Sequence, residues 1–484
     1  MSQPNTAPVP ASTLTEWTDD VDVLVIGFGI AGGSAAVEAA ARGARVLVLE
    51  RAAVAGGTTA LAGGHFYLGG GTAVQQATGH ADSADEMYKY LMSVSLEPEP
   101  EKIRAYADGS VDHFDWLESL GLRFERSYYP EKAVIQPGTE GLMYTGNEKV
   151  WPFCEEAVPA PRGHKVPRPG DTGGAAMAID ALLARAADLG VEIRYETGAT
   201  ALIVDAAEVV GATWRRFGEA GAIRARSVVI AAGGFVMNAE MVAEHVPELA
   251  QKPYTLGTTY DDGLGILLGQ SVGGATAHMD QAFITAPVYP PSILLTGLIV
   301  NGEGRRFVAE DSYHSRTSAF ALEQPGARAY LIVDSAHMAR PQVPLVPFID
   351  GWETVAEMAA ALDIPAEQLQ STLDHYNEHA ARGADPDFHK APQWLAAQDD
   401  GPWAAFDLTL GKAFYAGFTL GGLRTSVDAE VLRADGSAVA GLYAAGACAS
   451  NIAQDGKGYA SGTQLGEGSF FGRRAGRRAA ATAQ

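Results

Sequence analysis

Short apolar runs alternate with alanine-rich segments at the start of the chain. Residues 21–26 are apolar and largely β-branched and lead into a glycine-rich turn, and residues 31–42 are rich in alanine. The first pattern predicts a buried strand and the second a helix. Residues 44–50 form a second apolar run. The opening segment is therefore expected to be a strand–helix–strand unit with parallel strands.

The same alternation continues further along the chain. Residues 173–189 predict a helix, and residues 191–195 and 227–232 predict two more strands. From this texture we expect a doubly wound α/β pattern that continues to about residue 285.

The pattern then changes. Residues 299–311 combine a strand, a turn at Asn301-Gly302 and a charged stretch, residues 341–347 are rich in proline, and residues 353–382 predict helices. We interpret this part as a second, α+β capping domain.

From about Gly417 the chain is glycine-rich again, and the apolar run 441–445 predicts a strand that returns to the first domain. A chain of 484 residues exceeds the usual size of a single core. The expected organisation is a flexible tail (1–20), a discontinuous α/β domain (21–285 and 416–484) and an inserted catalytic or capping domain (286–415).

Composition narrows the range of partners. A formal net charge of −23 disfavours binding to nucleic acid or to anionic membrane surfaces. No apolar run approaches the roughly 20 residues of a spanning helix, so we expect no membrane-integral segment. The first 20 residues lack a basic start followed by an apolar run, and Cys154 and Cys448 are too far apart for a CxxC motif. A cytoplasmic protein that acts on a small, weakly charged molecule is expected.

The turn after the first strand has a specific spacing. Gly27 permits a tight turn, Gly29 lets the backbone approach a pyrophosphate, and Gly32 allows the helix to pack closely on the strand. The helix N-terminus offers free amides to the phosphates, and Glu50 at the end of the second strand can accept hydrogen bonds from a ribose. Together these features predict a dinucleotide site.

Two further glycine-rich segments favour FAD over a nicotinamide dinucleotide. Residues 55–64 can lie against a long cofactor, and residues 441–446 and 462–466 offer a second strand end and a helix start for the flavin. Gly263-Leu264-Gly265 follows two aspartates instead of an apolar strand, so a second nucleotide site is not expected. The expected FAD contacts are Gly27, Gly29, Ile30, Ala31, Gly32, Glu50, Arg51, Gly57, Thr58, Thr59, Ala62, Gly63, Gly64, Ala201, Ala232, Gly233, Gly446, Gly462, Thr463, Leu465 and Gly466.

Other chemistries find little support. His375 and His379 stand four residues apart, but the glutamate that follows the first histidine in metalloproteases is missing, so no metal site is expected. No Gly-x-Ser-x-Gly elbow stands at a strand-to-helix turn, which argues against a hydrolase.

With these motifs in place, the chain resembles the flavoprotein family of fumarate reductase, succinate dehydrogenase and the 3-ketosteroid dehydrogenases. The resemblance rests on the glycine fingerprint, on residues 56–64, 301–307 and 421–423, and on the C-terminal glycine segments. It implies a Rossmann-type FAD-binding domain like that of glutathione reductase, with an inserted capping domain.

Residues 310–313, 417–425 and 458–463 resemble most the 3-ketosteroid Δ4-(5α)-dehydrogenases of this family. By position, the resemblance implies that Tyr313, Tyr459 and Ser461 are active-site residues. Residues 418–420 read Phe-Thr-Leu where the fumarate and succinate enzymes have a histidine, which favours a small apolar ketone over a dicarboxylate. No histidine stands immediately before residues 56–59, so non-covalent FAD is implied.

The residues suggest a division of labour. Tyr459 would hydrogen-bond the enolate oxygen, and Ser461 would accept the α-proton and pass it to Tyr313 or water. The resemblance alone implies that the proton leaves C4 of a 3-ketosteroid and that hydride passes from C5 to flavin N5. Two alternative functions stay open: an oxidase or dehydrogenase of another ring-containing intermediate in secondary metabolism, and a flavin-carrying electron-transfer subunit. The electron acceptor also stays open and is either a separate carrier or O2. The three side chains also have structural alternatives, namely packing for the tyrosines and a turn or cap for the serine.

Overall fold

A central nine-stranded sheet organises the chain in the computed structural model, which describes residues 6–134, 136–251 and 254–482. Five of its strands run parallel in the order β21-β10-β2-β3-β7. These strands are β2 (Asp19–Ile26), β3 (Val46–Leu49), β7 (Glu192–Arg194), β10 (Glu219–Ile230) and β21 (Ala438–Ala444).

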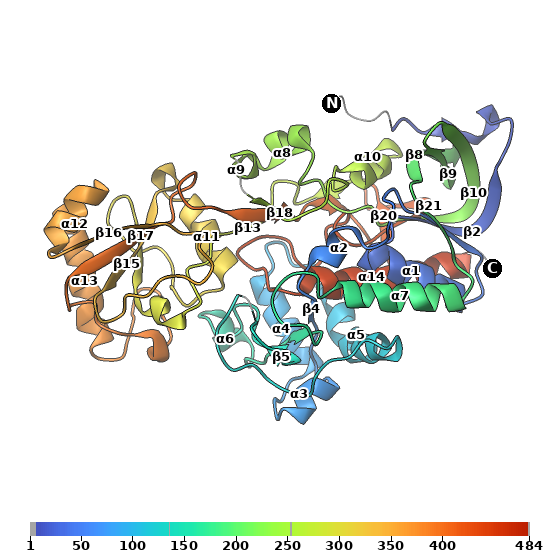
Figure 1. Cartoon of the computed structure of the whole chain (residues 1–484). Helices are drawn as coiled ribbons and strands as arrows, with labels where there is room; N and C mark the ends of the chain where they lie inside the picture. The colour runs from blue at the N-terminus through green and yellow to red at the C-terminus, as the bar shows by residue number, and fades with distance from the viewer. Residues whose placement is uncertain (1–5, 135, 252–253, 483–484) are drawn as a thin grey trace.

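The predicted strand–helix–strand unit is confirmed as β2, α1 (Ile30–Ala41) and β3. Three helices, α1, α7 (Ala176–Asp188) and α14 (Thr463–Thr482), lie together below the sheet in Figure 1. Helix α14 packs directly on α1, because a Cβ at Gly472 would lie 2.4 Å from the carbonyl oxygen of Ala31. Glycine thus lets the two helices approach at backbone distance.

The C-terminal part of the chain returns to the first sheet, as the run at 441–445 predicted. Strand β21 pairs in parallel with β10, from Val228 opposite Leu442 to Ile230 opposite Ala444. The carboxyl ends of β2, β10 and β21 therefore meet at one edge of the sheet.

The expected doubly wound pattern up to residue 285 is wrong in two places. Strands β8 (Gly198–Asp205), β9 (Glu208–Arg216) and β10 form an antiparallel meander. From Ile223 to Ser227, β10 alternates buried and exposed residues, as a strand with one solvent-exposed face does. Residues 65–165 form helices around a small antiparallel sheet. Its elements are β4 (His65–Tyr67), α3 (Ala73–Ala77), α4 (Ala84–Val94), α5 (Pro100–Ser119), β5 (Leu142–Met143), α6 (Phe153–Glu156) and β6 (Gly163–Lys165).

Part of the segment expected to be a flexible tail contacts the sheet. Strand β1 (Val9–Pro10) pairs with β8, and the Thr18 amide donates to the Ala222 carbonyl oxygen at 2.8 Å. Two residues of strand are too short to leave a hydrophobic pattern in the sequence. Residues 1–5 of the expected tail lie outside the described residues.

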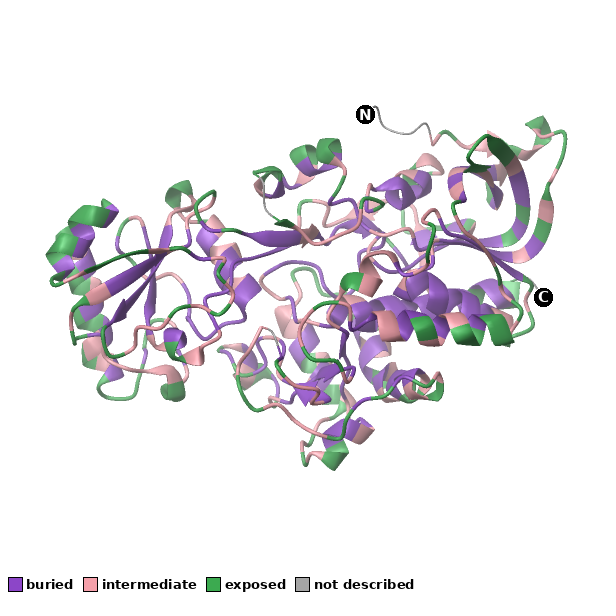
Figure 2. Ribbon diagram, in the orientation of Figure 1, coloured by how far each residue is buried: buried purple, intermediate pink, exposed green. Residues whose placement is uncertain are grey.

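A second sheet stands apart from the first, at the left of Figure 1, with its own buried residues (Figure 2). It contains β14 (Leu298–Asn301), β15 (Ala329–Asp334), β17 (Trp403–Asp407) and β16 (Phe348–Trp352), accompanied by α11 (His314–Leu322), α12 (Val355–Leu362) and α13 (Ala366–Ala380). Strand β18 (Ala416–Thr419), between the two parts, pairs with β11 (Tyr254–Thr255) and β13 (Ala282–Thr285).

The remaining elements are short. They are α2 (Gly57–Leu61), α8 (Ala239–His245), α9 (Pro247–Ala250), α10 (Leu264–Ser271), β12 (Thr276–Ala277), β19 (Gly422–Leu423), β20 (Glu430–Leu432) and the 3₁₀ turns Ala11–Thr13, Ser292–Thr296, Pro325–Ala327 and Pro392–Trp394. Among the described residues, none of the helices combines the length and the apolar character needed to cross a membrane.

Candidate functional site

One cavity of about 840 Å³ lies where the carboxyl ends of the parallel strands meet. Its wall combines the glycine turn after β2 with segments from the second half of the chain. The predicted residues that line it are Gly27, Gly29, Ile30, Ala31, Glu50, Arg51, Gly57, Thr58, Thr59, Ala62, Gly63, Gly64, Ala232, Gly233, Tyr313, Gly446, Tyr459, Ser461, Gly462 and Leu465. The fold thus places most of the predicted cofactor residues and the three predicted catalytic residues around the same space.

The glycine turn leaves no room for side chains at two positions. Gly27 has φ +96°, and a Cβ there would lie 2.5 Å from the carbonyl oxygen of Ala231. A Cβ at Gly32 would lie 2.0 Å from the carbonyl oxygen of Gly27. Gly29 is the N-cap of α1, so the N-terminus of this helix faces the cavity, where its positive end can bind phosphate.

Glu50 has a role that the sequence did not reveal. Its carboxylate is buried and accepts backbone hydrogen bonds from the amides of Phe28 and Ala52, each at 2.8 Å. The side chain therefore ties the end of β3 to the glycine turn after β2. Each carboxylate oxygen keeps a further acceptor site, so the ribose contact stays a prediction.

The two threonines of the second glycine segment are also held in place. The Ile30 amide donates to Thr59 Oγ1 at 3.1 Å, and the Thr58 hydroxyl donates to the carboxylate of Asp261. Asp261 also accepts from the amides of Thr258 at 2.9 Å and Gly234 at 3.2 Å, and burial raises the pKa of its carboxyl. Sequence reasoning passed over Asp261, because it lies about 200 residues from its threonine partner and no motif links the two.

Aromatic side chains form the wall on the side of the second sheet. The ring of Phe283 stacks on Phe418 with centroids 4.8 Å apart and meets the ring of Tyr459 at 4.7 Å. Tyr313 belongs to the same buried cluster. A flat apolar molecule matches such an aromatic surface.

Burial sets the protonation states here. Desolvation is the main cause that raises the pKa of Tyr459 and of Tyr313 above the ordinary value, and a hydrogen bond with Ser461 partly opposes the rise at Tyr313. Burial lowers the pKa of His314, whose Nδ1 lies 2.6 Å from Thr285 Oγ1, to about 3. Near neutral pH the cavity therefore presents neutral phenols as hydrogen-bond donors and an uncharged imidazole.

Four predicted cofactor residues do not line the cavity. Gly32 and Gly466 permit close packing, since a Cβ at Gly466 would meet the hydroxyl of Tyr106 at 2.3 Å. The Thr463 hydroxyl donates to the Ala460 carbonyl oxygen at 2.7 Å and fixes the start of α14. Ala201 is buried within β8 opposite Thr213. The prediction for Ala201 was too far along the strand, because the cavity wall is formed by residues 197–199.

Glu467, on α14, lies behind Tyr459, and its titration should make the stability of the protein depend on pH. Its buried carboxylate accepts from the amides of Ile452 at 2.7 Å and Ala453 at 3.0 Å, and burial raises its pKa from 4.5 to about 7. A raised carboxyl pKa stabilises the folded state at low pH, and this contribution is lost as pH rises from about 4.5 to about 7. The rise corresponds to about 3 kcal/mol.

We expect Glu467→Gln to remove this dependence, since one amide oxygen can replace the oxygen that accepts both bonds. Urea unfolding of wild type and variant between pH 4.5 and 7 should show the wild type losing stability relative to the variant as pH rises. The exposed Glu101→Gln serves as control. Parallel curves for wild type and Glu467→Gln would refute the assignment.

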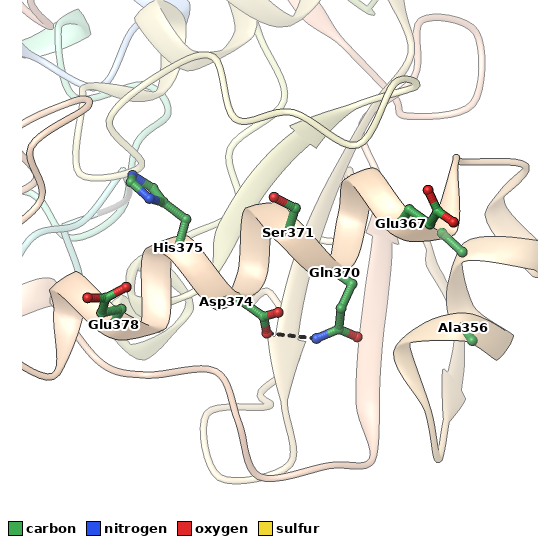
Figure 3. A pocket seen from close by; sticks show the side chains of 8 residues that line it. Ala356, Glu367, Gln370, Ser371, Asp374, His375 and Glu378 are labelled. Carbon is green, nitrogen blue, oxygen red and sulfur yellow. Dashed lines mark hydrogen bonds between the residues drawn. The ribbon is translucent and has the colours of Figure 1, made fainter.

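A second, shallow depression lies between α12 and α13 (Figure 3). Glu367, Asp374, His375 and Glu378 line it, and Gln370 donates to Asp374 at 2.8 Å. His375 instead pairs with Asp387 at 3.0 Å. No cluster of three or more His, Cys, Asp or Glu side chains suited to a metal ion occurs in the part of the chain that the structure describes.

Comparison with known proteins agrees with this geometry. The FAD binding domain family model matches residues 22–468. A solved 3-ketosteroid Δ4-(5α)-dehydrogenase of Rhodococcus jostii RHA1, in complex with 4-androstene-3,17-dione, is 43% identical, with a TM-score of 0.91 and coverage of 98% of this chain and 99% of that chain. The 3-oxo-5-alpha-steroid 4-dehydrogenase of Comamonas testosteroni is 28% identical, over 89% of this chain and 93% of that protein.

Other relatives carry out reductions. The urocanate reductase of Eggerthella lenta is 29% identical, over 96% of this chain and 75% of that protein. The match of the family model over most of the chain, together with the cavity that its glycine segments form, shows that this chain belongs to the FAD binding domain family, as a flavoprotein oxidoreductase related to the fumarate reductases and 3-ketosteroid dehydrogenases.

Proposed function

We propose that this flavoprotein removes two hydrogens from adjacent carbons of an apolar ketone, with a 3-ketosteroid as the substrate and a 4-ene-3-one as the product. The observation that carries the proposal is the placement of Tyr313, Tyr459 and Ser461 in one cavity with the glycine segments. The 43% identity to a 3-ketosteroid Δ4-(5α)-dehydrogenase solved with a steroid supports the choice of substrate.

The chain's own residues supply the acid–base part of this reaction. Bound FAD supplies the hydride acceptor. Tyr459 donates a hydrogen bond to the substrate carbonyl oxygen and so makes the neighbouring C–H bond more acidic. Ser461, in contact with Tyr313, receives the proton while its own hydroxyl proton passes to Tyr313, whose hydroxyl proton in turn passes to water. Phe283 and Phe418 hold the ring system flat and exclude water.

The finer architecture belongs to the same proposal. The parallel strand order and the glycine turn support a Rossmann-type, glutathione-reductase-like domain made of residues 21–285 and 416–484, with residues 286–415 as the capping domain. FAD would be held without a covalent bond, because no histidine precedes the segment at residues 56–59. Cys154 and Cys448 are free thiols, which agrees with a cytoplasmic location.

Anaerobic mixing with a saturated 3-ketosteroid tests the function. After mixing, we expect the absorbance of the oxidised flavin in the purified holoprotein to fall and a 4-ene-3-one to accumulate. Succinate is the control and should leave the flavin oxidised. Unchanged flavin with a panel of 5α- and 5β-reduced 3-ketosteroids would refute the proposal. Repeating the reaction in air identifies the acceptor, since rapid formation of peroxide assigns O2 and its absence assigns a separate carrier.

A further inference from the structure

Two separate segments supply the proposed catalytic residues, and one short stretch of chain, residues 145–147, holds both of them. The Ser461 amide donates to the carbonyl oxygen of Thr145 at 2.8 Å. The Tyr313 amide donates to Asn147 Oδ1 at 2.8 Å, and Asn147 Nδ2 donates to the carbonyl oxygen of Lys457 at 3.3 Å, two residues before Tyr459. A single side-chain amide therefore bridges the segment of Tyr313 and the segment of Tyr459.

Asn147 is itself held firmly in place. Its side chain is completely buried, and its own amide donates to the hydroxyl of Tyr90 at 2.9 Å. The neighbouring carboxylate of Glu148 accepts from the Gly146 amide at 3.0 Å and from the Tyr67 hydroxyl at 3.0 Å, which fixes the turn. The turn that holds Asn147 is therefore fixed by Tyr67 and Tyr90, which belong to neither of the two segments that Asn147 connects.

We propose that Asn147 is a positioning residue that sets the distance between Tyr313 and the Tyr459–Ser461 segment, an inference that rests on the proposed function. Asn147 does not line the cavity. It acts through the backbones that carry the reacting side chains. Since a displacement of about 1 Å can cost about 10²-fold in rate, loss of the bridge lowers turnover more than it weakens ketone binding.

Two variants separate positioning from general stability. Asn147→Leu has similar size and loses both hydrogen bonds at every pH. Asn147→Asp keeps the acceptor for the Tyr313 amide, but only its protonated form can donate to the Lys457 carbonyl oxygen. We expect kcat to fall about 10- to 100-fold in Asn147→Leu, with a smaller change in KM. In Asn147→Asp the ratio of kcat to that of wild type should rise as pH falls. Burial raises the pKa of the Tyr90 hydroxyl, which stays neutral, and burial also raises the pKa of the Glu148 carboxyl, which is present in both proteins.

Asn377→Leu is the matched control. The Asn377 side-chain amide also bridges an N–H and a carbonyl, both of Gln398, at 2.7 Å and 3.2 Å, but it lies away from the cavity. It should lose stability and keep kcat. A kcat in Asn147→Leu equal to that of wild type, or a pH-independent ratio in Asn147→Asp, overturns the proposal.

Hydrogen exchange at the Tyr313 amide gives a readout that does not depend on the substrate. Exchange should be faster in Asn147→Leu than in wild type and in Asn377→Leu, because the amide has lost its acceptor. If no ketone reduces the wild-type flavin, the proposed function is wrong. Hydrogen exchange at the Tyr313 amide then tests by itself whether Asn147 positions the Tyr313 segment. Unchanged exchange at Tyr313 would refute it. Should Asn147→Leu not fold, Asn147→Ala, which also removes both hydrogen bonds, carries both measurements.

Discussion

Tyr459→Phe is expected to slow flavin reduction by a saturated 3-ketosteroid about 10²- to 10³-fold, the usual cost of removing one hydrogen-bond donor from a developing oxyanion. The phenyl ring keeps its contacts with Phe283 and Phe418, at 4.7 Å and 5.7 Å between centroids, so the variant should fold and bind FAD as the wild type does. Anaerobic stopped-flow absorbance measures the rate directly.

Tyr443→Phe is a matched control for this experiment. Tyr443 is buried as deeply as Tyr459 and its hydroxyl lies 3.1 Å from Thr482 Oγ1, but it does not line the cavity. Its flavin should be reduced at the wild-type rate. A Tyr459→Phe variant as fast as this control would remove the Tyr459 hydroxyl from the reaction and leave the ring as a packing element.

Gly32→Ala should weaken FAD binding about 10- to 100-fold, and the purified variant should contain substoichiometric flavin. The new Cβ would lie 2.0 Å from the carbonyl oxygen of Gly27, which is backbone and cannot rotate away. Overpacking of this kind costs about 1–3 kcal/mol, and here the displaced atoms belong to the turn that we propose as the pyrophosphate site.

The ratio of FAD to polypeptide and the dissociation constant from flavin fluorescence quenching measure the effect. Gly218→Ala is the control, because no heavy atom lies within 4 Å of the position that its Cβ would take. Equal flavin content in the two variants would show that the turn tolerates a methyl group, and the close approach of α1 to β2 would then not be required for FAD binding.

The sequence predicted features that depend on neighbouring residues and missed those that depend on contacts between residues far apart in the chain. The turn from Gly27 to Gly32 was predictable because neighbouring residues in one short segment determine its backbone geometry. Tyr313, Tyr459 and Ser461 came from the resemblance, and the fold places them in one cavity.

Asp261 and Asn147 left no signal in the sequence. Each acts through a partner at least 160 residues away, Thr58 for the first and Tyr313 for the second, and neither lies in a recurring motif. The meander of β8, β9 and β10 was missed for a different reason. Its apolar runs resemble those of parallel strands, although the turn at Ala206-Ala207, between β8 and β9, is too short to hold a helix.

The pairing of β10 with β21 has a consequence for the newly made chain. Strand β10 emerges from the ribosome well before β21, so residues 231–437 are synthesised while the end of one edge of β10, at residues 228–230, has no partner beyond its pairing with β9. An open edge of apolar strand invites association with other nascent polypeptides. Cells that make this flavoprotein must therefore shield a half-built sheet during translation, and slow elongation across this interval should favour aggregates over soluble product.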